Sequence, residues 1–545
     1  MNILKRNTVS FIGLIFVSFL LISSLILTIN PLNGLNFQDN NEVYNDFDLR
    51  MNAQYGENIT VISDGFNGVW GWNDGWSNNP EIAVDGSGNI HVVWVDDTIG
   101  YWGGGMDSEI FYAKYTAATS QWSNITVISD GFNDVWGWND EWSDSPSIAV
   151  DNLGNIHVVW NDYSSGIWHD SYDDAEIMYV KYSVTTSQWS NVTILSDGWD
   201  NVWGWNNESS EDPAIVTDNS GNVHVVWQDR TVGSWTGGID DNEIMYVNYS
   251  VATGHWSNVT IISDTSTGWN DDQSADPDID IDSNGNIHVI WEDKTNGIWG
   301  DDEEIMWTMY SSSSGKWLNA TVISDGYNNV WGWNTGDCDD PKIVVDNSGN
   351  AHAVWGDYSN GTWRNNMEDD EIMYAKYSAT TGQWSNVTII SDGHGGTWWN
   401  LGESENVDIS ADDRGIIHVV WEDGTNGTWG TDDEIMYTNW TASSGWSFPV
   451  VVSDGYNGTY WNDGWSGQPA IATDSNNQIH IVWYDDTVGL WGSDYEIMYV
   501  KLPSIISEGK PPFPWLLIML IGGTAAAVVI GVVVIVLIKR KGRGT

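Results

Sequence analysis

The sequence predicts an all-β, seven-bladed β-propeller with four-stranded antiparallel blades over residues 58–502. Three observations predict it: one motif recurs seven times, four strand-like runs accompany each recurrence, and the first run of the chain completes the last unit. The motif is GNIHVVW or a close variant, and successive copies lie 62 to 67 residues apart. Its histidines are His91, His157, His224, His288, His352, His418 and His480.

Each unit contains four short runs rich in Val, Ile, Thr, Trp and Tyr, bounded by Gly, Asn, Asp and Ser, as is typical of strands. In consensus the runs are VTIISD, PxIAVD, IHVVWxD and DEIMYxKYS. A long VWGWND loop, an xxGN turn, a GxWGxD loop and an xxTGQW turn connect them in that order. No helical period of useful length is present between residues 58 and 502, and four strands in each repeat favour a propeller over a solenoid.

The two ends of the repeat region predict a closed ring. The first strand, Asn58 to Ser63, precedes the first complete unit, whereas the last unit ends at Glu496 to Leu502 without a fourth strand. We therefore expect the N-terminal strand to complete the last blade, because an unpaired sheet edge is a liability.

Antiparallel connections alternate between the two ends of a blade, so the loops sort by face. The VWGWND and GxWGxD loops share one face, which we call the loop face. The xxGN and TGQW turns share the other, which we call the turn face. Most of the loop tryptophan and carboxylate is therefore predicted to lie at one end of the propeller.

The composition excludes some partners. The chain has 545 residues and a formal net charge of -58, from 76 acidic and 18 basic residues. Such a chain repels a phosphate backbone, so nucleic acid is not an expected partner, whereas divalent cations are attracted. The single cysteine, Cys338, excludes an intrachain disulfide and is expected to be a small residue in a polar loop.

Both ends of the chain are expected to contain membrane-targeting or membrane-spanning segments. Residues 1–30 form a predicted signal peptide or uncleaved signal anchor, and residues 31–57 a linker. Residues 503–514 form a proline-bearing juxtamembrane linker, residues 515–538 a transmembrane helix long enough for a bilayer core of about 30 Å, and residues 539–545 a basic cytoplasmic tail. The propeller is thus predicted to lie outside the cell, at the cell membrane.

Potential N-glycosylation sites agree with an exterior location. An N-x-Thr triplet recurs at the entry to the VTIIS strand, although Asn and Thr also suit a turn and an edge strand. The asparagines of these triplets are Asn58, Asn124, Asn191, Asn258, Asn319 and Asn386.

Two sets of carboxylates recur on the predicted loop face. A W-x-D triplet ends one strand, at Asp96, Asp162, Asp229, Asp293, Asp357, Asp423 and Asp485. A D-x-E triplet begins the next, at Asp107 and Glu109, Asp174 and Glu176, Asp241 and Glu243, Asp302 and Glu304, Asp369 and Glu371, Asp432 and Glu434, and Asp494 and Glu496. Two explanations stay open: these groups accept N–H bonds that fix the hairpins, or they hold a structural Ca²⁺, which takes six to eight oxygen ligands. A sevenfold copy argues against a catalytic acid pair, which would be asymmetric.

The histidines and tryptophans of the IHVVW strands, from Trp94 to Trp483, are predicted to be core residues because apolar residues flank them on both sides. The loop tryptophans are candidates for ligand binding. Flat indoles can stack on sugar rings while nearby carboxylates and amides bind hydroxyls; the alternatives are that the indoles fasten the loops to the blades, or that they bind a protein partner. The candidates are Trp72, Trp102, Trp138, Trp168, Trp205, Trp235, Trp299, Trp333, Trp363, Trp429 and Trp491.

The repeats DxxGNIHVVWxD and DxEIMYxKYS resemble those of sialidase-like (BNR-type) propellers of exported prokaryotic proteins across residues 58–502. The resemblance implies the fold but not the activity. The Asp-box pattern S-x-D-x-G-x-x-W is not matched, and sialidases bind the substrate carboxylate with three arginines. The repeat region has only Arg230, Arg364 and Arg414, and Arg414 belongs to a turn-face segment, so the triad cannot assemble on one face.

The function expected from the sequence is therefore that of a membrane-anchored extracellular propeller that binds glycans or surface proteins in adhesion or recognition. Ca²⁺ is the one candidate cofactor, and no organic cofactor is expected. The alternatives are a glycoside hydrolase or lyase with an asymmetric acid pair, and a structural cell-envelope component assembled through divalent cations. A single ligand site is expected near the irregular repeats, around Trp269 or residues 394–399.

Overall fold

The computed structural model describes residues 59–503 except for segments of the loops. These segments are 65–72, 99–106, 131–138, 140, 165–173, 198–205, 207, 232–241, 264–269, 271, 301, 326–333, 335, 359–369, 393–399, 401, 426–430, 455–461, 463 and 490–492. By its internal contacts the chain divides after Leu502 into two units, and the propeller belongs to the first. In the described part every regular element is a strand, and no helix there is long and apolar enough to cross a membrane. The predicted membrane segments, 1–30 and 515–538, lie outside the described residues and stay predictions.

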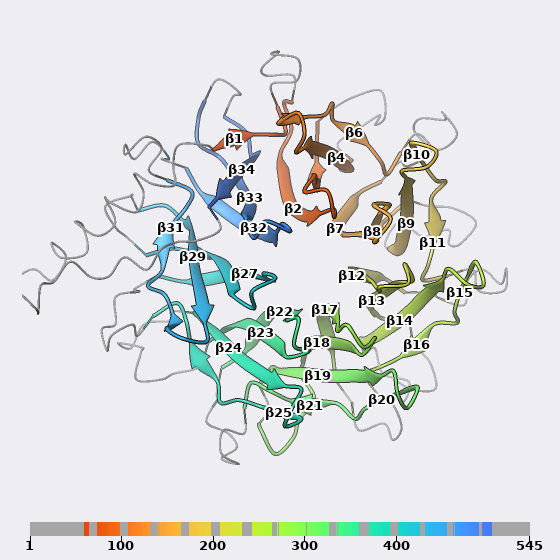
Figure 1. The fold of residues 1–545 in the computed structure, drawn as a ribbon, viewed down its shortest axis with the longest axis vertical. Coiled ribbons are helices and arrows are strands. Elements are labelled where there is room, and N and C mark those ends of the chain that lie inside the picture. Colours follow the sequence, from red (N-terminus) through yellow and green to blue (C-terminus); the bar gives the residue numbers. More distant parts are fainter. Residues whose placement is uncertain are drawn as a thin grey trace, which may run out of the picture. The chain divides into compact units, whose positions relative to one another are not determined.

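Seven antiparallel sheets stand around a central axis, which confirms the predicted seven-bladed propeller (Figure 1). The PxIA strand is innermost in every blade, a position that the sequence left open. These strands are β2 (Ser77–Val84), β7 (Ser143–Val150), β12 (Ser210–Thr217), β17 (Ser274–Ile281), β22 (Cys338–Val345), β27 (Ser404–Ala411) and β32 (Ser466–Thr473). We number the blades one to seven in this order.

The IHVVW and EIMYxKY runs form the second and third strands of each blade. The second strands are β3 (Ile90–Asp96), β8 (Ile156–Asp162), β13 (Val223–Asp229), β18 (Ile287–Asp293), β23 (Ala351–Asp357), β28 (Ile417–Asp423) and β33 (Ile479–Asp485). The third strands are β4 (Glu109–Thr116), β9 (Glu176–Ser183), β14 (Glu243–Ser250), β19 (Glu304–Ser311), β24 (Glu371–Ser378), β29 (Glu434–Thr441) and β34 (Glu496–Leu502).

The outermost strand of blades one to six is split into two short pieces that both pair with the third strand, whereas the sequence predicted one continuous strand. The first piece comes from the predicted TGQW turn, so that turn is shorter than expected. The pieces are β5 (Gln121–Trp122) and β6 (Thr126–Val127), β10 (Gln188–Trp189) and β11 (Thr193–Ile194), β15 (His255–Trp256) and β16 (Thr260–Ile261), β20 (Lys316–Trp317) and β21 (Thr321–Val322), β25 (Gln383–Trp384) and β26 (Thr388–Ile389), and β30 (Gly445–Trp446) and β31 (Val450–Val451). In blade seven the outermost strand is β1 (Thr60–Val61), paired antiparallel with β34, so the predicted closure by the N-terminal strand is confirmed.

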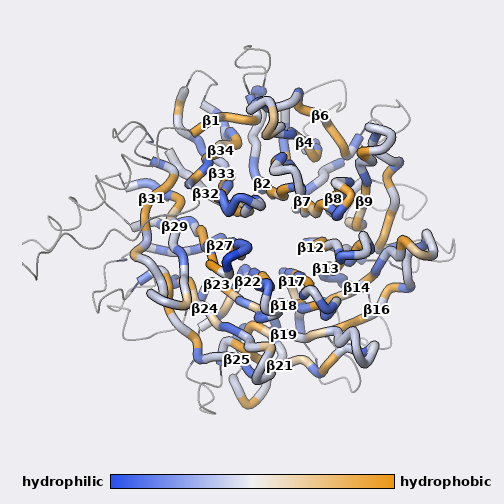
Figure 2. The backbone as a smooth tube through the Cα atoms, in the orientation of Figure 1, coloured by the Kyte–Doolittle hydropathy of each residue, from blue (hydrophilic) through white to orange (hydrophobic). Residues whose placement is uncertain are grey.

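Apolar side chains fill the space between neighbouring blades. Figure 2 shows apolar residues concentrated in the strands and hydrophilic residues at the turns around the central opening. The second strands are almost wholly buried, and Trp94 and its six counterparts are 0% exposed, as the continuous apolar pattern predicts. Edge-to-face aromatic pairs add blade-to-blade contacts, such as Tyr112 of blade one against Trp189 of blade two, with ring centroids 5.1 Å apart.

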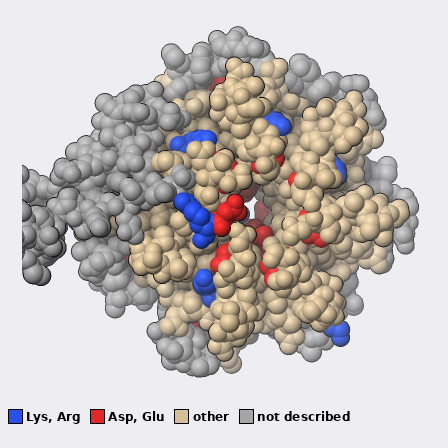
Figure 3. All heavy atoms as spheres, in the orientation of Figure 1, with Lys and Arg blue, Asp and Glu red and all other residues tan. Residues whose placement is uncertain are grey.

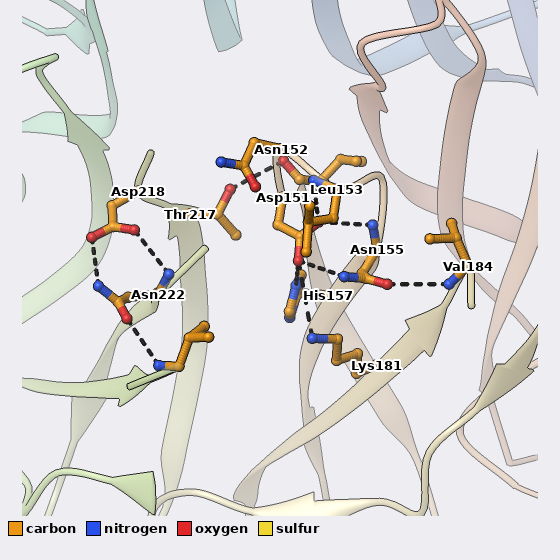
Figure 4. Close-up of polar contacts among 12 residues, drawn as sticks. Asp151, Asn152, Leu153, Asn155, His157, Lys181, Val184, Thr217, Asp218 and Asn222 are labelled. Atoms are coloured by element: carbon orange, nitrogen blue, oxygen red, sulfur yellow. Dashed lines mark hydrogen bonds and ion pairs between the residues drawn. The ribbon is translucent and has the colours of Figure 1, made fainter. Parts of the chain in front are cut away.

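The turn-face histidines are structural, as predicted. In Figure 4, Asp151 accepts hydrogen bonds from the backbone N–H groups of Leu153 and Asn155, both at 2.9 Å, and its second oxygen accepts one from the Asn155 amide at 2.7 Å. His157 lies 3.4 Å from the same oxygen and 2.8 Å from the Tyr179 hydroxyl. Burial lowers the pKa of His157, so the ring is neutral at pH 7. This network fixes the turn and gives both ring nitrogens of His157 a partner.

Every innermost strand carries a β-bulge near its loop-face end. In β2 the register shifts between Asn78 and Glu81, and Asn79 adopts a left-handed φ of 47° immediately before Pro80. Six further residues have the same conformation at the corresponding positions: Ser145, Asp212, Asp276, Asp340, Asn406 and Gln468. Proline has no N–H to give to a sheet and suits a bulge on an edge strand. The seven bulges surround the central axis and give the channel its irregular wall.

Ring closure generates a prediction. Ile62 is buried, and its backbone N–H donates to Ile497 O at 2.9 Å, the same bond that Ile128 makes to Ile110 O within blade one. Ile62→Pro removes the bond that joins the two ends of the ring, whereas Ile128→Pro removes its equivalent in a blade held by the chain on both sides. Both should cost about 3 kcal/mol locally. Only Ile62→Pro should also open the ring. Its Tm, measured by circular dichroism, should therefore fall by several degrees more than that of Ile128→Pro. Equal losses of Tm would show that closure contributes nothing of its own.

Candidate functional site

The W-x-D aspartates are hydrogen-bonding hubs that join the two loop-face connections. In blade one Asp96 is 0% exposed, and its Oδ2 accepts bonds from Trp94 Nε1 at 3.0 Å, Ser77 Oγ at 2.9 Å and Asn73 Nδ2 at 3.0 Å. Its Oδ1 accepts the Thr98 N–H at 2.9 Å. Asn73 ends the long loop and Thr98 begins the other, and the Thr98 hydroxyl donates to the Asn73 side chain. The described ends of both loops therefore meet on one face.

The same hub recurs around the ring. The tryptophan-to-aspartate bond is present in six blades, at Asp96, Asp162, Asp229, Asp293, Asp423 and Asp485. In blade five Cys338 takes the place of the hub serine, with Sγ 3.5 Å from Asp357 Oδ2. Cys338 is thus a fully buried first residue of β22, not a residue of a polar loop as the sequence suggested. Both oxygens of these aspartates accept hydrogen bonds from protein donors. The aspartates therefore fix the hairpins, as the first of the two explanations from the sequence proposes.

The glutamates of the D-x-E triplets are also buried at the loop-face end. Glu109 Oε2 accepts the Ser129 hydroxyl, and burial, followed by repulsion from Asp130 and Asp162, raises its pKa to about 9. Asp241 and Asp369 lie outside the described residues. Across the part of the chain that the structure covers, no three carboxylate, imidazole or thiol groups already enclose a point as metal ligands would. Calcium binding stays a prediction.

Of the predicted ligand-binding tryptophans, only Trp299 is described. It is half-buried against the core between blades three and four, and its Nε1 donates to Thr295 O at 3.0 Å, which fastens its own loop. The other ten, the irregular segment 394–399 and Trp269 lie outside the described residues. Five of the six candidate glycosylation asparagines are exposed, namely Asn124, Asn191, Asn258, Asn319 and Asn386, and Asn58 is outside the described range.

An exposed group of aromatic residues that the sequence analysis did not single out lies at the loop-face ends of three neighbouring innermost strands. Trp465, Trp76 and Trp142 directly precede β32, β2 and β7, and are 55%, 59% and 59% exposed. Tyr495 extends the group, with its ring centroid 5.5 Å from that of Trp76, and Tyr484 lies 5.1 Å beyond it. We call these five residues the aromatic arc. Blades three to six have Ser209, Gln273, Asp337 and Glu403 at the tryptophan position, so the arc covers only one side of the ring.

The other side of the loop face carries half-buried carboxyl groups, which we call the acidic arc. They come from the first residues of the innermost strands and the last residues of the second strands of blades three to six. The members are Asp212, Asp276, Glu292, Asp339, Asp340, Glu405 and Glu422. Burial is the main cause of their raised pKa values, about 7 for Asp212, about 9 for Glu292, about 8 for Asp339 and about 7 for Glu422.

Three members of the acidic arc are joined across the boundary between blades three and four. Burial is the main cause that raises the pKa of Glu292, and the neighbouring Asp276 carboxylate raises it further; burial also raises the pKa of Asp276, while its contact with Glu292 lowers it. Asp276 also shares a hydrogen bond with Asp212. Gln228 supports the group, since its Nε2 donates to Asp212 at 2.7 Å and its Oε1 accepts the Asp276 N–H at 3.3 Å. At neutral pH this cluster offers both a proton donor and acceptors.

A central cavity of about 370 Å³ is lined by all seven innermost strands, including Asp212, Asp276 and Asp340 of the acidic arc. Lys342 is the one cation in its lining, and it faces Glu81, Asp278 and Asp408 from three other blades. Burial alone would lower the pKa of Lys342, but these carboxylates raise it, so the ammonium stays charged. Burial, opposed by Lys342, raises the pKa of Glu81 to about 8. Figure 3 shows the opposite, turn-face end of this channel, where the turns between innermost and second strands surround the opening and acidic side chains also lie around it.

The arrangement suits a polar, uncharged or cationic ligand and not an anionic one. Two of the three arginines of the repeat region are described. Arg230 follows the loop-face end of β13, and Arg414 lies in the turn between β27 and β28 with its Nε 2.7 Å from Asp412. These two lie at opposite faces and cannot bind one carboxylate together; Arg364 is outside the described residues.

No model of a protein family matches the chain, and no curated protein matches it. Solved structures with a similar arrangement of strands include a polysaccharide lyase of family PL25, an ulvan lyase, with 10% identity, 80% of this chain and 96% of that chain covered, and a TM-score of 0.49. The intramolecular trans-sialidase of Ruminococcus gnavus has 12% identity, 84% and 99% coverage and a TM-score of 0.39. A protein of unknown function from Dyadobacter fermentans has 10% identity, 66% and 94% coverage and a TM-score of 0.40. At this level of similarity the comparisons assign no activity.

The hub makes a prediction about stability. Asp96→Ala leaves the Trp94 indole, the Ser77 hydroxyl and the Asn73 amide without their buried acceptor, and should lower the free energy of unfolding by about 3–5 kcal/mol. The neighbouring half-buried Asp97 is the control, and Asp97→Ala should cost less than about 1 kcal/mol. Urea unfolding followed by tryptophan fluorescence measures both. Similar losses in the two variants would contradict the hub.

The Glu292 pKa makes a prediction about pH. Because its pKa is raised to about 9 in the folded protein, Glu292 keeps its proton when the unfolded chain has lost it. Its stabilising effect is therefore complete below pH of about 4.5 and is lost progressively as the pH rises towards 9. Glu292→Gln, which stays neutral, should flatten the fall in Tm between pH 5 and pH 9. Glu208→Gln, at an exposed loop-face position, should leave the profile unchanged; a wild-type profile in Glu292→Gln would refute the assignment.

Proposed function

We propose that the protein is a membrane-anchored propeller, outside the cell, that binds neutral or amine-bearing glycans at the loop-face mouth of its central channel. The observation that carries this proposal is the aromatic arc, in which three exposed indoles lie at the loop-face ends of consecutive innermost strands, the strands that also line the cavity. A group of exposed apolar side chains on a protein surface marks a site that binds a ligand or a partner. Indole faces stack on the C–H faces of sugar rings, and the acidic arc supplies donors and acceptors for hydroxyl groups.

The negative charge at the loop-face mouth of the channel limits which glycans can bind there. Carboxylates dominate the acidic arc, and Lys342, the one cation of the cavity lining, is already neutralised by Glu81, Asp278 and Asp408. An acidic sugar would bring another negative charge into a partly buried site and would be repelled. Uncharged sugars and sugars with a protonated amine avoid that cost.

A second candidate function is acid-assisted cleavage of a glycan at the same place. Support comes from the Glu292–Asp276 pair, which is found in one blade and so is asymmetric in the way a catalytic pair must be. Glu292 would be the proton donor. This function predicts release of sugar fragments that is lost in Glu292→Gln, whereas binding alone predicts no product.

Binding to a glycan array by the full-length protein in detergent tests the proposal. Trp76→Ala, Trp142→Ala and Trp465→Ala should each weaken binding about tenfold, equivalent to about 1.4 kcal/mol for one lost stacking contact. Leu153→Ala is the matched control, because Leu153 is 73% exposed but lies on the turn face. Binding that survives all three tryptophan substitutions, or that Leu153→Ala weakens equally, would overturn the proposed site. No array binding, together with Ca²⁺-dependent self-association, would favour a structural role in the cell envelope.

A further inference from the structure

The loop-face ends of the third strands bury carboxylate oxygens that no hydrogen bond satisfies. At the boundary between blades six and seven, Glu434 is 0% exposed at the start of β29. Its Oε2 accepts the Ser453 hydroxyl, whereas its Oε1 has no hydrogen-bond partner. The same oxygen is without a partner in four further glutamates at equivalent positions: Glu109, Glu176, Glu304 and Glu496. A buried carboxyl oxygen without a partner is costly, and its repetition at equivalent positions suggests that a further group binds there.

A second carboxylate lies beside each of these glutamates. Asp432 is two residues before Glu434; its Oδ1 accepts the Thr431 N–H at 2.9 Å, and its buried Oδ2 has no hydrogen-bond partner. Asp494 repeats this before Glu496, with Oδ1 accepting the Ser493 N–H at 2.9 Å and Oδ2 without a partner. Two boundaries thus each hold two buried carboxylate oxygens without hydrogen bonds.

A third carboxylate comes from a triplet at the end of the outermost strand that reads I-S-D in five blades, L-S-D in blade two and V-S-D in blade six; we call it the I-S-D triplet. Asp454 is 1% exposed, and one of its oxygens accepts the Asn462 N–H of blade seven at 3.3 Å. Burial is the main cause that raises the pKa of Glu434 well above its ordinary value, and the nearby carboxylates Asp454, Asp432 and Asp485 raise it further. Asp485 is the hub of blade seven and its oxygens are already used.

We propose that a divalent cation, of which Ca²⁺ fits best, binds at these blade boundaries between the two carboxylates of the D-x-E triplet and the aspartate of the I-S-D triplet. Ca²⁺ is a hard cation that takes oxygen ligands in a flexible geometry and completes its shell with water. The W-x-D aspartates, which the sequence offered as ligands, are excluded because the hub occupies them. The I-S-D aspartates, which the sequence analysis did not consider, take their place.

The three carboxylates come from one blade, and the ion would lie where that blade meets the next. Asn139 of blade two donates to Glu109 Oε2 of blade one at 3.4 Å and to its own hub Asp162 at 3.0 Å, so the glutamate is already fastened across the boundary. Binding Ca²⁺ would draw the three carboxylates together by side-chain rotation and stabilise the ring one boundary at a time. This role does not depend on glycan binding.

The full-length protein in detergent, stripped with EDTA, tests the inference with CaCl₂ alone as the probe. Equilibrium dialysis with atomic absorption should find about five bound ions, one for each boundary described above, and Tm should rise by about 5 °C or more at millimolar Ca²⁺. The double variant Asp432→Asn, Glu434→Gln should bind one ion fewer, and Asp494→Asn, Glu496→Gln should do the same at a second boundary.

The boundary variants also make the surface less negative, which could weaken Ca²⁺ binding in a non-specific way. The control is the double variant Glu208→Gln, Asp413→Asn, which removes the same charge from exposed positions and should leave the number of bound ions unchanged. Near-ultraviolet circular dichroism of the buried tryptophans reports whether each variant is folded. If the double variant does not fold, the single variant Glu434→Gln replaces it, because glutamine has the shape of glutamate and keeps the hydrogen bond with Ser453. The inference is overturned if Ca²⁺ leaves Tm unchanged, or if the boundary variants and the surface control bind equal numbers of ions.

Discussion

The fold depends on one buried interaction, the hydrogen bond from a core tryptophan to the aspartate two residues later. That aspartate also holds a serine at the start of the innermost strand and an asparagine at the end of the long loop. One side chain therefore fixes the second strand, the innermost strand and both loop-face connections of its blade. Burying an ionisable group is costly, and four donors from the protein are what make its burial tolerable.

Residues that recur in every blade form the scaffold of the ring, whereas residues present in only some blades form the candidate site. The hubs, the turn-face histidines and the bulges occur in all blades or nearly all, as expected of groups that hold a ring together. The exceptions gather at one place: indoles on blades seven, one and two, carboxyl groups on blades three to six, and Lys342 in the central cavity. A glycan-binding site needs unlike groups facing each other, which a symmetric ring cannot provide, so the departures from the repeat carry the functional argument.

The ring of seven blades and the buried histidines could be predicted from the sequence, because a motif that recurs seven times outweighs the ambiguity of any one copy. The split of the outermost strand into two pieces was not predicted. The sequence left the innermost strand open, although Pro80 and its counterparts mark an edge strand with a bulge. It overlooked Trp76, Trp142 and Trp465 because a consensus hides residues present in only three units. The contact of Asp276 with Glu292 depends on the bulge in β17, and its contact with Asp212 crosses a blade boundary; neither can be predicted from the spacing of residues in the sequence.

Hydrogen-exchange mass spectrometry of the full-length protein, with and without an oligosaccharide selected on the array, is the most direct test of the central claim that the broken symmetry of the loop face is the binding site. The account predicts slower exchange in residues 73–80, 141–147 and 464–469, with no change in the turns at 85–89 and 151–155. Protection confined to those turns, or spread evenly over all seven blades, would contradict it.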